Sequence, residues 1–260
     1  MPEILEVETY RRAAERALGR RVAAVRADDD WYLKGGLEAS ELHSALGGAR
    51  FVAARRRGKL LLLDVDAGAV LGLRFGMTGR LLVDDGAAID RLEYSSDRDD
   101  PAWDRFGLTF DDGGSMVLRD PRRLGGVELD PDEGALGPDA WTIGPATLRD
   151  VLAGSTAPLK TRLMDQARLA GMGNLLTDET LWRAGLAPTR DAGSLDAREL
   201  RRLHRNLRRV LNDLDERGGS HTGDLQASRQ RGATCPRDGS PLRREAVGGR
   251  TTYWCPAHQR

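Results

Sequence analysis

The period of the hydrophobic pattern changes near the middle of this chain, and that change most strongly limits the folds it can adopt. Up to Leu129, apolar residues occur in short runs separated by turns rich in glycine and aspartate. After Gly144 they recur at helical spacing. The segment between, Asp130–Gly144, is acidic and aperiodic. The sequence therefore predicts a β-rich half, a boundary, and a helical half.

Each half contains several predicted elements. One helix is predicted at the start, over Glu6–Leu18. Short strands follow, as expected for a β-sandwich or barrel; they cover Val22–Val25, Phe51–Arg55, Leu60–Val65, Val70–Phe75, Leu81–Val83, Phe106–Phe110, Met116–Leu118 and Val127–Leu129. Helices are predicted over Pro145–Ala153, Leu159–Ala167, Asn174–Ala184 and Asp196–Arg217, and a β-hairpin from Cys235 to His258.

These patterns predict an α+β fold with three domains, namely residues 1–130, 131–234 and 235–260. The chain has 260 residues, 40% of them hydrophobic and 31% charged, which is typical of a globular protein and argues against disorder. We expect a cytoplasmic protein, because no apolar run is long enough for a membrane helix and the acidic start is unlike a signal peptide. Only two cysteines are present, which excludes a disulfide scaffold.

The charges are distributed unevenly along the chain. Forty basic and 40 acidic residues give a net charge of zero, but the segment Lys160–Arg260 holds 19 basic and 12 acidic residues. A basic half is the expected footprint of a polyanion partner, although ordinary surface charge explains it equally well.

The first residues carry the least common chemistry. Removal of Met1 would leave the secondary amine of Pro2 as the chain start. An α-amine has a reference pKa of about 7.7–8.0, so much of it is free to attack a carbon near neutral pH. Glu3 beside it is a candidate general acid or base. The alternative is that Glu3 and Glu6 are only favourable charges in a first helical turn.

Two further strings have suggestive spacing. In Gly171-Met172-Gly173-Asn174 a helix ends, two glycines turn, and a helix begins, a geometry that exposes backbone N–H groups to a phosphate but also suits a plain helical hairpin. Near the C-terminus, one pair of candidate metal ligands is Cys235 and Asp238, and a second pair is Cys255 and His258. Both pairs have zinc-knuckle spacing, and a metal-free hairpin is the alternative to a structural Zn²⁺ site.

Together these segments resemble the formamidopyrimidine-DNA glycosylase/endonuclease VIII family of base-excision-repair enzymes. The opening Met1–Thr9, the Gly171–Asn174 string and the C-terminal hairpin each match a family motif. The resemblance implies a catalytic β-sandwich, a helix–two-turn–helix domain and a zinc finger, with damaged double-stranded DNA in the cleft between the halves.

The resemblance also implies roles for individual residues. The catalytic residues would be Pro2, Glu3 and Lys59: Pro2 would form a Schiff base with deoxyribose, assisted by Glu3, and Lys59 would contact DNA. The residues expected to contact DNA elsewhere are Met77, Arg122, Leu124, Lys160, Gly171, Gly173, Asn174 and Arg250. Met77, Arg122 and Leu124 would fill the space left by a flipped nucleotide, although core packing also explains Met77 and Leu124.

The expected activity is removal of oxidised bases, foremost oxidised purines such as 8-oxoguanine and formamidopyrimidines. Strand cleavage through β-elimination would follow, with or without a subsequent δ-elimination. We expect no organic cofactor and a monomer. Three departures from the family pattern bear on the substrate. Leu5 replaces the second proline common in the family's opening, and Leu124 replaces the phenylalanine typical of the purine-type enzymes. The segment Gly218–Thr234 is shorter than the corresponding segment of formamidopyrimidine enzymes. Three alternatives therefore stay open: the same chemistry on oxidised pyrimidines or abasic sites, a non-catalytic damaged-DNA-binding protein, and a zinc-ribbon interaction module.

Overall fold

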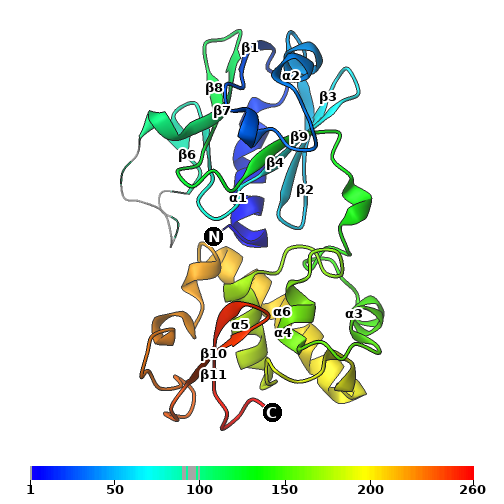
Figure 1. Ribbon diagram of the computed structural model, residues 1–260, viewed down its shortest axis with the longest axis vertical. Coiled ribbons are helices and arrows are strands. Elements are labelled where there is room, and N and C mark those ends of the chain that lie inside the picture. The colour runs from blue at the N-terminus through cyan, green and yellow to red at the C-terminus, as the bar shows by residue number, and fades with distance from the viewer. Residues whose placement is uncertain (1, 90–91, 93–97, 99) are drawn as a thin grey trace. The chain divides into compact units, whose positions relative to one another are not determined.

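The computed structural model describes residues 2–89, 92, 98 and 100–260. The chain divides into two compact units, Met1–Glu133 and Gly134–Arg260 (Figure 1). None of the helices in the described part of the chain combines the length and apolar character that a membrane crossing requires.

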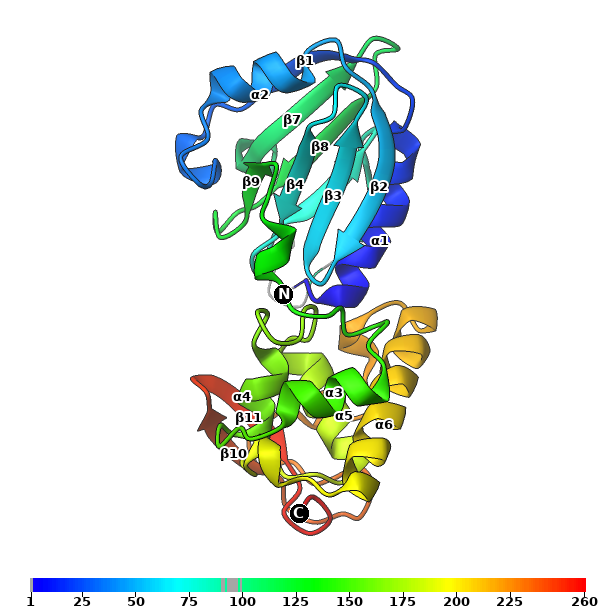
Figure 2. The same cartoon turned by 90° about the vertical axis from the view of Figure 1, so that its right-hand side faces the viewer.

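The first unit contains two antiparallel sheets. The five-stranded sheet has the order β1 (Val22–Arg26), β7 (Asp104–Phe110), β8 (Ser115–Arg119), β5 (Arg80–Val83), β6 (Gly86–Ala87). The four-stranded sheet has the order β2 (Phe51–Arg57), β3 (Leu60–Val65), β4 (Val70–Arg74), β9 (Gly126–Leu129). Figure 2 shows the four-stranded sheet in front of β7 and β8, so the two sheets form a sandwich.

The core of this unit lies between the sheets. Leu61, Leu63, Leu71 and Leu73 come from the four-stranded sheet, and they belong to the same buried cluster as the phenylalanines of β7. Helix α1 (Ile4–Ala14) lies along the β2 side of the sandwich (Figure 2) and contacts β2, β3 and β5. Its buried residues Val7, Tyr10 and Ala14 join the core, so apolar burial fixes the helix against both sheets.

The second unit is helical and ends in a hairpin. Its helices are α3 (Pro145–Leu152), α4 (Leu159–Met164), α5 (Asn174–Ala184) and α6 (Ala197–Glu216). Helix α5 is buried along most of its length and contacts α4, α6 and the hairpin strand β11 (Arg250–Trp254), which pairs with β10 (Arg243–Val247). Helix α5 therefore lies at the centre of α4, α6 and the hairpin, and α3 packs against α6.

The predicted fold class is confirmed, with a β-sandwich, a helical domain and a C-terminal β-hairpin. Several bounds differ from the prediction. Helix α2 (Ala39–Leu46) and the short strand β6 had no prediction, α1 spans Ile4–Ala14 rather than Glu6–Leu18, and α4 ends at Met164 rather than Ala167. Helix α1 begins early because the Glu3 and Glu6 carboxylates satisfy its first backbone N–H groups.

Candidate functional site

The start of α1 holds Pro2 and Glu3, and both are buried. Glu3 is the N-cap residue of the helix and forms a reciprocal capping box with Glu6, in which the Glu3 backbone N–H donates to Oε2 of Glu6 at 2.8 Å. Both glutamates therefore stabilise the start of α1. It leaves open a second role for Glu3, since its carboxylate lies one residue from the Pro2 nitrogen.

Lys59 lies in the tight turn between β2 and β3 and is half-buried. Arg56 attaches this turn to α1, because its Nε donates to Oε2 of Glu8 at 3.1 Å and its Nη1 donates to the Gly58 carbonyl at 3.1 Å. Arg56 itself is only 8% exposed. The turn that carries Lys59 is therefore attached to the first turns of the helix that begins after Glu3.

Two other loops of this unit carry Met77, Arg122 and Leu124. Met77 is half-buried in the turn between β4 and β5, whereas Arg122 and Leu124 are exposed in the turn between β8 and β9. Leu124 is 52% exposed, one of three large apolar side chains in the described chain with this degree of exposure. Core packing is therefore excluded for Leu124. The half-buried Met77 is compatible both with core packing and with filling the space left by a flipped nucleotide.

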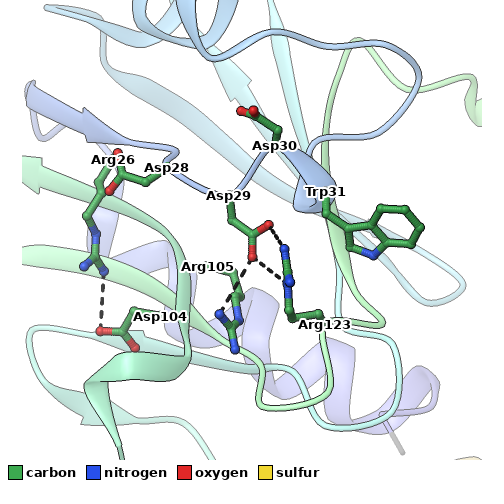
Figure 3. Close-up of a pocket in the computed structure, with 8 residues that line it drawn as sticks. All are labelled: Arg26, Asp28, Asp29, Asp30, Trp31, Asp104, Arg105 and Arg123. Atoms are coloured by element: carbon green, nitrogen blue, oxygen red, sulfur yellow. Dashed lines mark hydrogen bonds and ion pairs between the residues drawn. The ribbon is translucent and has the colours of Figure 1, made fainter.

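A polar pocket of about 490 Å³ opens beside the second of these loops (Figure 3). Asp29 lies at its centre, where it accepts a hydrogen bond from Arg123 Nε at 2.9 Å and forms an ion pair with Arg105 at 3.8 Å. Arg26 pairs with Asp104 at 3.4 Å. Because its arginines are neutralised in this way, the pocket is an anchor for the loop rather than an anion site.

In the second unit, the predicted glycine turn joins α4 to α5. Gly171 has a φ of +114°, which only glycine adopts easily, and Gly173 is the N-cap residue of α5. Gln166 holds the turn closed, since its Oε1 accepts from the Gly171 N–H at 2.9 Å and its Nε2 donates to the carbonyls of Met164 and Met172. Asn174 is therefore the first helical residue, as in the predicted helix Asn174–Ala184, and the N-cap position belongs to Gly173.

Lys160 is placed differently from the phosphate-contacting role implied by the resemblance. It is fully buried, and its Nζ forms an ion pair with Asp178 at 2.7 Å and donates to Thr252 Oγ1 at 2.8 Å. Asp178 also pairs with Arg229. The ammonium has no exposed surface with which to contact a phosphate, so in this structure Lys160 connects α4, α5 and β11.

Arg250, by contrast, is exposed at the start of β11. It lines a groove of about 310 Å³ together with Thr161, Arg162 and Met164 of α4. The hairpin turn packs closely on that helix, because a Cβ on Gly248 would lie 2.4 Å from Thr161 Oγ1. The groove lies beside the end of α4, just before the glycine turn, and Asp165 lines it together with the two arginines.

The four predicted metal ligands meet at the base of the hairpin. Their ligand atoms all lie within 4.8 Å of one another. His258 Nδ1 is 3.8 Å from Cys235 Sγ and 2.8 Å from Asp238 Oδ2, and Cys255 Sγ is 3.4 Å from Asp238 Oδ2. Both cysteines are buried beside Trp182, Leu225 and Leu242.

This arrangement fits a tetrahedral Zn²⁺ ion. Bond lengths of about 2.0–2.3 Å to nitrogen, oxygen and sulfur place neighbouring ligand atoms about 3.3–3.8 Å apart. The His258–Asp238 pair is closer than that and would separate slightly around an ion. The Trp182 indole N–H donates to Cys235 Sγ at 3.3 Å, as outer partners of zinc thiolates do. Two thiolates, one imidazole and one carboxylate are suitable zinc ligands, so these residues would hold a structural ion.

Sequence reasoning assigned no role to several residues that build these sites. Asp120 precedes Arg122 by two residues and Gln166 precedes Gly171 by five, and each organises its turn through its side chain. An aspartate directly before proline at a turn is a known acceptor for the backbone N–H groups that follow, and this signal was available for Asp120. Asp178 gave no such signal, because a charged residue on a helix is ordinarily exposed.

Comparison with known proteins gives one family for both units. Residues 1–127 match the family model described as formamidopyrimidine-DNA glycosylase N-terminal domain, and residues 135–225 match that described as formamidopyrimidine-DNA glycosylase H2TH domain. Curated relatives named formamidopyrimidine-DNA glycosylase include those of Chloroflexus aggregans, with 33% identity over 100% of this chain and 98% of the relative, and Paracoccus denitrificans, with 35% identity over 100% of both.

Solved structures agree with the sequence relatives. The complex of wild-type Lactococcus lactis Fpg with DNA containing N7-benzyl-Fapy-dG matches with a TM-score of 0.83 and 25% identity over 100% of both chains. The complex of the same protein with DNA containing an abasic site gives the same values.

Proposed function

The chain belongs to the formamidopyrimidine-DNA glycosylase family, and on that premise we propose that it is a base-excision-repair glycosylase with abasic-site lyase activity. Its substrate class is oxidised bases in double-stranded DNA, foremost oxidised purines such as 8-oxoguanine and formamidopyrimidines. One observation carries the catalytic part of the proposal: the candidate nucleophile Pro2 directly precedes Glu3, the N-cap residue of α1, in the unit that also presents Lys59 and the two loops.

The proposed reaction uses the amine that remains after removal of Met1, which lies outside the described residues. The Pro2 nitrogen attacks C1′ of the damaged nucleotide, the glycosidic bond breaks, and the base leaves with a proton. The C1′–O4′ bond then breaks, O4′ takes a proton from Glu3, and a cationic iminium forms. Because the iminium withdraws electrons, a C2′ proton is lost, the C3′–O bond breaks, and water finally releases Pro2.

DNA binding is assigned to groups in both units. Lys59 and Arg250 would contact phosphates, and Arg122 would help to fill the space that the flipped nucleotide leaves. The backbone N–H groups around Gly171, Gly173 and Asn174 would bind a phosphate at the start of α5. Met77 and Leu124 would occupy the space that the flipped nucleotide leaves. Zinc, when bound, would supply only a structural cross-link in the hairpin. We place the protein in the cytoplasm, acting on the chromosome as a monomer.

Borohydride trapping tests the proposal. Met-processed protein, incubated with a duplex containing one abasic site and sodium borohydride, should form a covalent adduct, and peptide mapping should locate the added mass on Pro2. A Pro2 amine blocked by a retained Met1 should give none. Absence of an adduct with fully processed protein would leave only non-catalytic DNA binding.

A second substrate class is favoured by one residue. Leu124 stands where the purine-type enzymes carry a phenylalanine. A shorter, aliphatic side chain stacks less on the base opposite the lesion, and this favours oxidised pyrimidines or abasic sites. Cleavage of a panel of duplexes, each with one lesion, separates the two: faster cleavage at 8-oxoguanine supports the first, and faster cleavage at oxidised thymine supports the second.

A further inference from the structure

The loops that carry Met77 and Leu124 share one buried carboxylate. Asp120 has no exposed surface, and its side chain accepts five hydrogen bonds. Three of the donors are backbone N–H groups of its own loop: Arg122 at 3.2 Å, Leu124 at 2.9 Å and Gly125 at 2.8 Å. The carboxylate thus fixes the backbone of the turn that presents Leu124.

The fourth hydrogen bond connects this turn to the Met77 loop. Thr78 Oγ1 donates to Asp120 Oδ1 at 2.6 Å and accepts from the Arg122 N–H at 3.4 Å. The two backbones also touch, since a Cβ on Gly76 would lie 2.4 Å from the carbonyl carbon of Leu124. No side chain separates the two turns at this point, so neither can move without the other.

The fifth hydrogen bond comes from Tyr32, whose hydroxyl donates to Asp120 Oδ2 at 3.2 Å. Burial, followed by the charge of Asp120, raises the pKa of Tyr32, so the phenol stays protonated and remains a donor. Gly125 packs against the same hydroxyl, because a Cβ there would lie 2.3 Å from Tyr32 Oη. On the outer side, Arg123 has a φ of +54° and is held by Asp29 (Figure 3).

A separate contact connects the pair of loops to the helix that follows Pro2. Tyr10 of α1 donates a hydrogen bond from its hydroxyl to the Gly79 carbonyl at 3.1 Å, and its ring packs against Phe75 with 4.4 Å between centroids. Tyr10 is fully buried. A continuous set of buried contacts therefore runs from α1 through the Met77 loop to Asp120 and the Leu124 turn.

We propose that Asp120 and Thr78 are positioning residues that hold the Met77 and Leu124 loops as one preformed wedge in register with α1. This inference rests on the proposed function, because it assumes that both side chains enter the duplex. A wedge that is already ordered loses little conformational entropy on insertion, which lowers the free-energy cost of filling the void. Removal of the coupling should therefore slow insertion and spare the chemistry at Pro2.

Thr78→Val and Thr78→Ser form a matched pair that tests the coupling. Valine keeps the shape of threonine without the hydroxyl, and serine keeps the hydroxyl. The first probe is a duplex with a tetrahydrofuran abasic-site analogue opposite 2-aminopurine, whose fluorescence changes when the stack is entered. We expect Thr78→Val to slow this change about five-fold to ten-fold, as for loss of one buried hydrogen bond, and Thr78→Ser to restore it.

The second probe separates insertion from chemistry. Borohydride trapping by Thr78→Val should slow by a similar factor on an abasic duplex but stay unchanged on a single-stranded abasic oligonucleotide, where there is no stack to enter. Asp120→Asn should slow trapping on the abasic duplex even more and should also leave trapping on the single-stranded oligonucleotide unchanged. Asp84→Asn is the control, because Asp84 also accepts a backbone N–H, from Ser115 at 3.1 Å, and its ion pairs are with Arg16 and Arg20, outside both loops.

Equal loss on both substrates, or a fluorescence change as fast in Thr78→Val as in the unaltered protein, would overturn the positioning role. So would unaltered protein that produces no fluorescence change with the analogue duplex. If the unaltered protein instead shows the change but forms no borohydride adduct, the lyase proposal fails and the positioning role stands.

Discussion

At the residue scale, two glutamates in this chain occupy the same local structure. Glu3 begins α1 and Glu38 begins α2, and each forms a capping box whose backbone N–H donates to the glutamate three residues later at 2.8 Å. Only Glu3 lies beside the candidate nucleophile. The chain thus contains its own control for separating helix capping from proton transfer.

Glu3→Gln should lower strand cleavage at an 8-oxoguanine duplex by about a hundred-fold or more, because an amide cannot donate the proton that O4′ takes when the sugar ring opens after the base has left. Glutamine still accepts an N–H bond, so the helix start is retained. Single-turnover strand cleavage at 8-oxoguanine measures the effect, while borohydride trapping at a preformed abasic site should change much less. Glu38→Gln should leave both rates unaltered; a comparable loss in that variant would assign the effect to capping.

At the element scale, the sequence predicted most elements but few of their connections. Strands and helices with strong periodicity, such as β3 and α5, have the predicted bounds because their apolar residues face a real core. The roles assigned to Pro2 and Glu3 rest on a motif that places chemistry in consecutive residues, and they stay predictions. The burial of Lys160 was not, because its partner Asp178 comes from another helix, and single-sequence patterns carry no information on such tertiary pairs.

The start of α6 predicts a pH effect on stability. Backbone hydrogen bonds at the cap, foremost from Glu199, lower the pKa of Asp196, and hydrogen bonds from Arg190 lower the pKa of Glu199. Stability from such groups is present above their unfolded pKa values of about 4 and is lost as the pH falls through the lower folded values.

We therefore expect Glu199→Gln to melt at a lower temperature than the unaltered protein at neutral pH, and the difference to vanish by about pH 2–3. Thermal unfolding followed by circular dichroism at several pH values checks this. A difference that persists unchanged into acid would show that the Arg190–Glu199 pair does not act through charge.

The hairpin predicts a metal requirement of its own. Purified protein should contain about one Zn²⁺ per chain, and chelation should lower the melting temperature, since a structural ion contributes directly to folding. Cys255→Ser should lose the zinc, whereas Asp238→Cys should keep it, because a thiolate is the stronger ligand. Elemental analysis with thermal melting gives the readout; unaltered zinc content in Cys255→Ser would refute these ligands.

At the scale of the whole molecule, zero net charge conceals two oppositely charged units. The unit Met1–Glu133 has 20 basic and 26 acidic residues, and the unit Gly134–Arg260 has 20 basic and 14 acidic residues. Affinity for a duplex depends on the cations that contact phosphates rather than on the sum over the chain. A neutral protein of this kind should therefore bind DNA with a clear dependence on salt.

Arg250→Gln tests which cations contribute. Each phosphate contact adds about −0.9 to the slope of log K against log salt concentration, so this variant should bind more weakly with a slope smaller by about 0.9. Arg243→Gln is the matched control on the same hairpin, because Arg243 is also exposed but lies over the Trp254 ring at 5.4 Å. Fluorescence anisotropy with an abasic-analogue duplex at several salt concentrations measures both. Equal slopes for Arg250→Gln and the unaltered protein would show that Arg250 does not contact a phosphate. An equal decrease of the slope in both variants would show that the effect comes from the protein's overall charge rather than from a phosphate contact by Arg250.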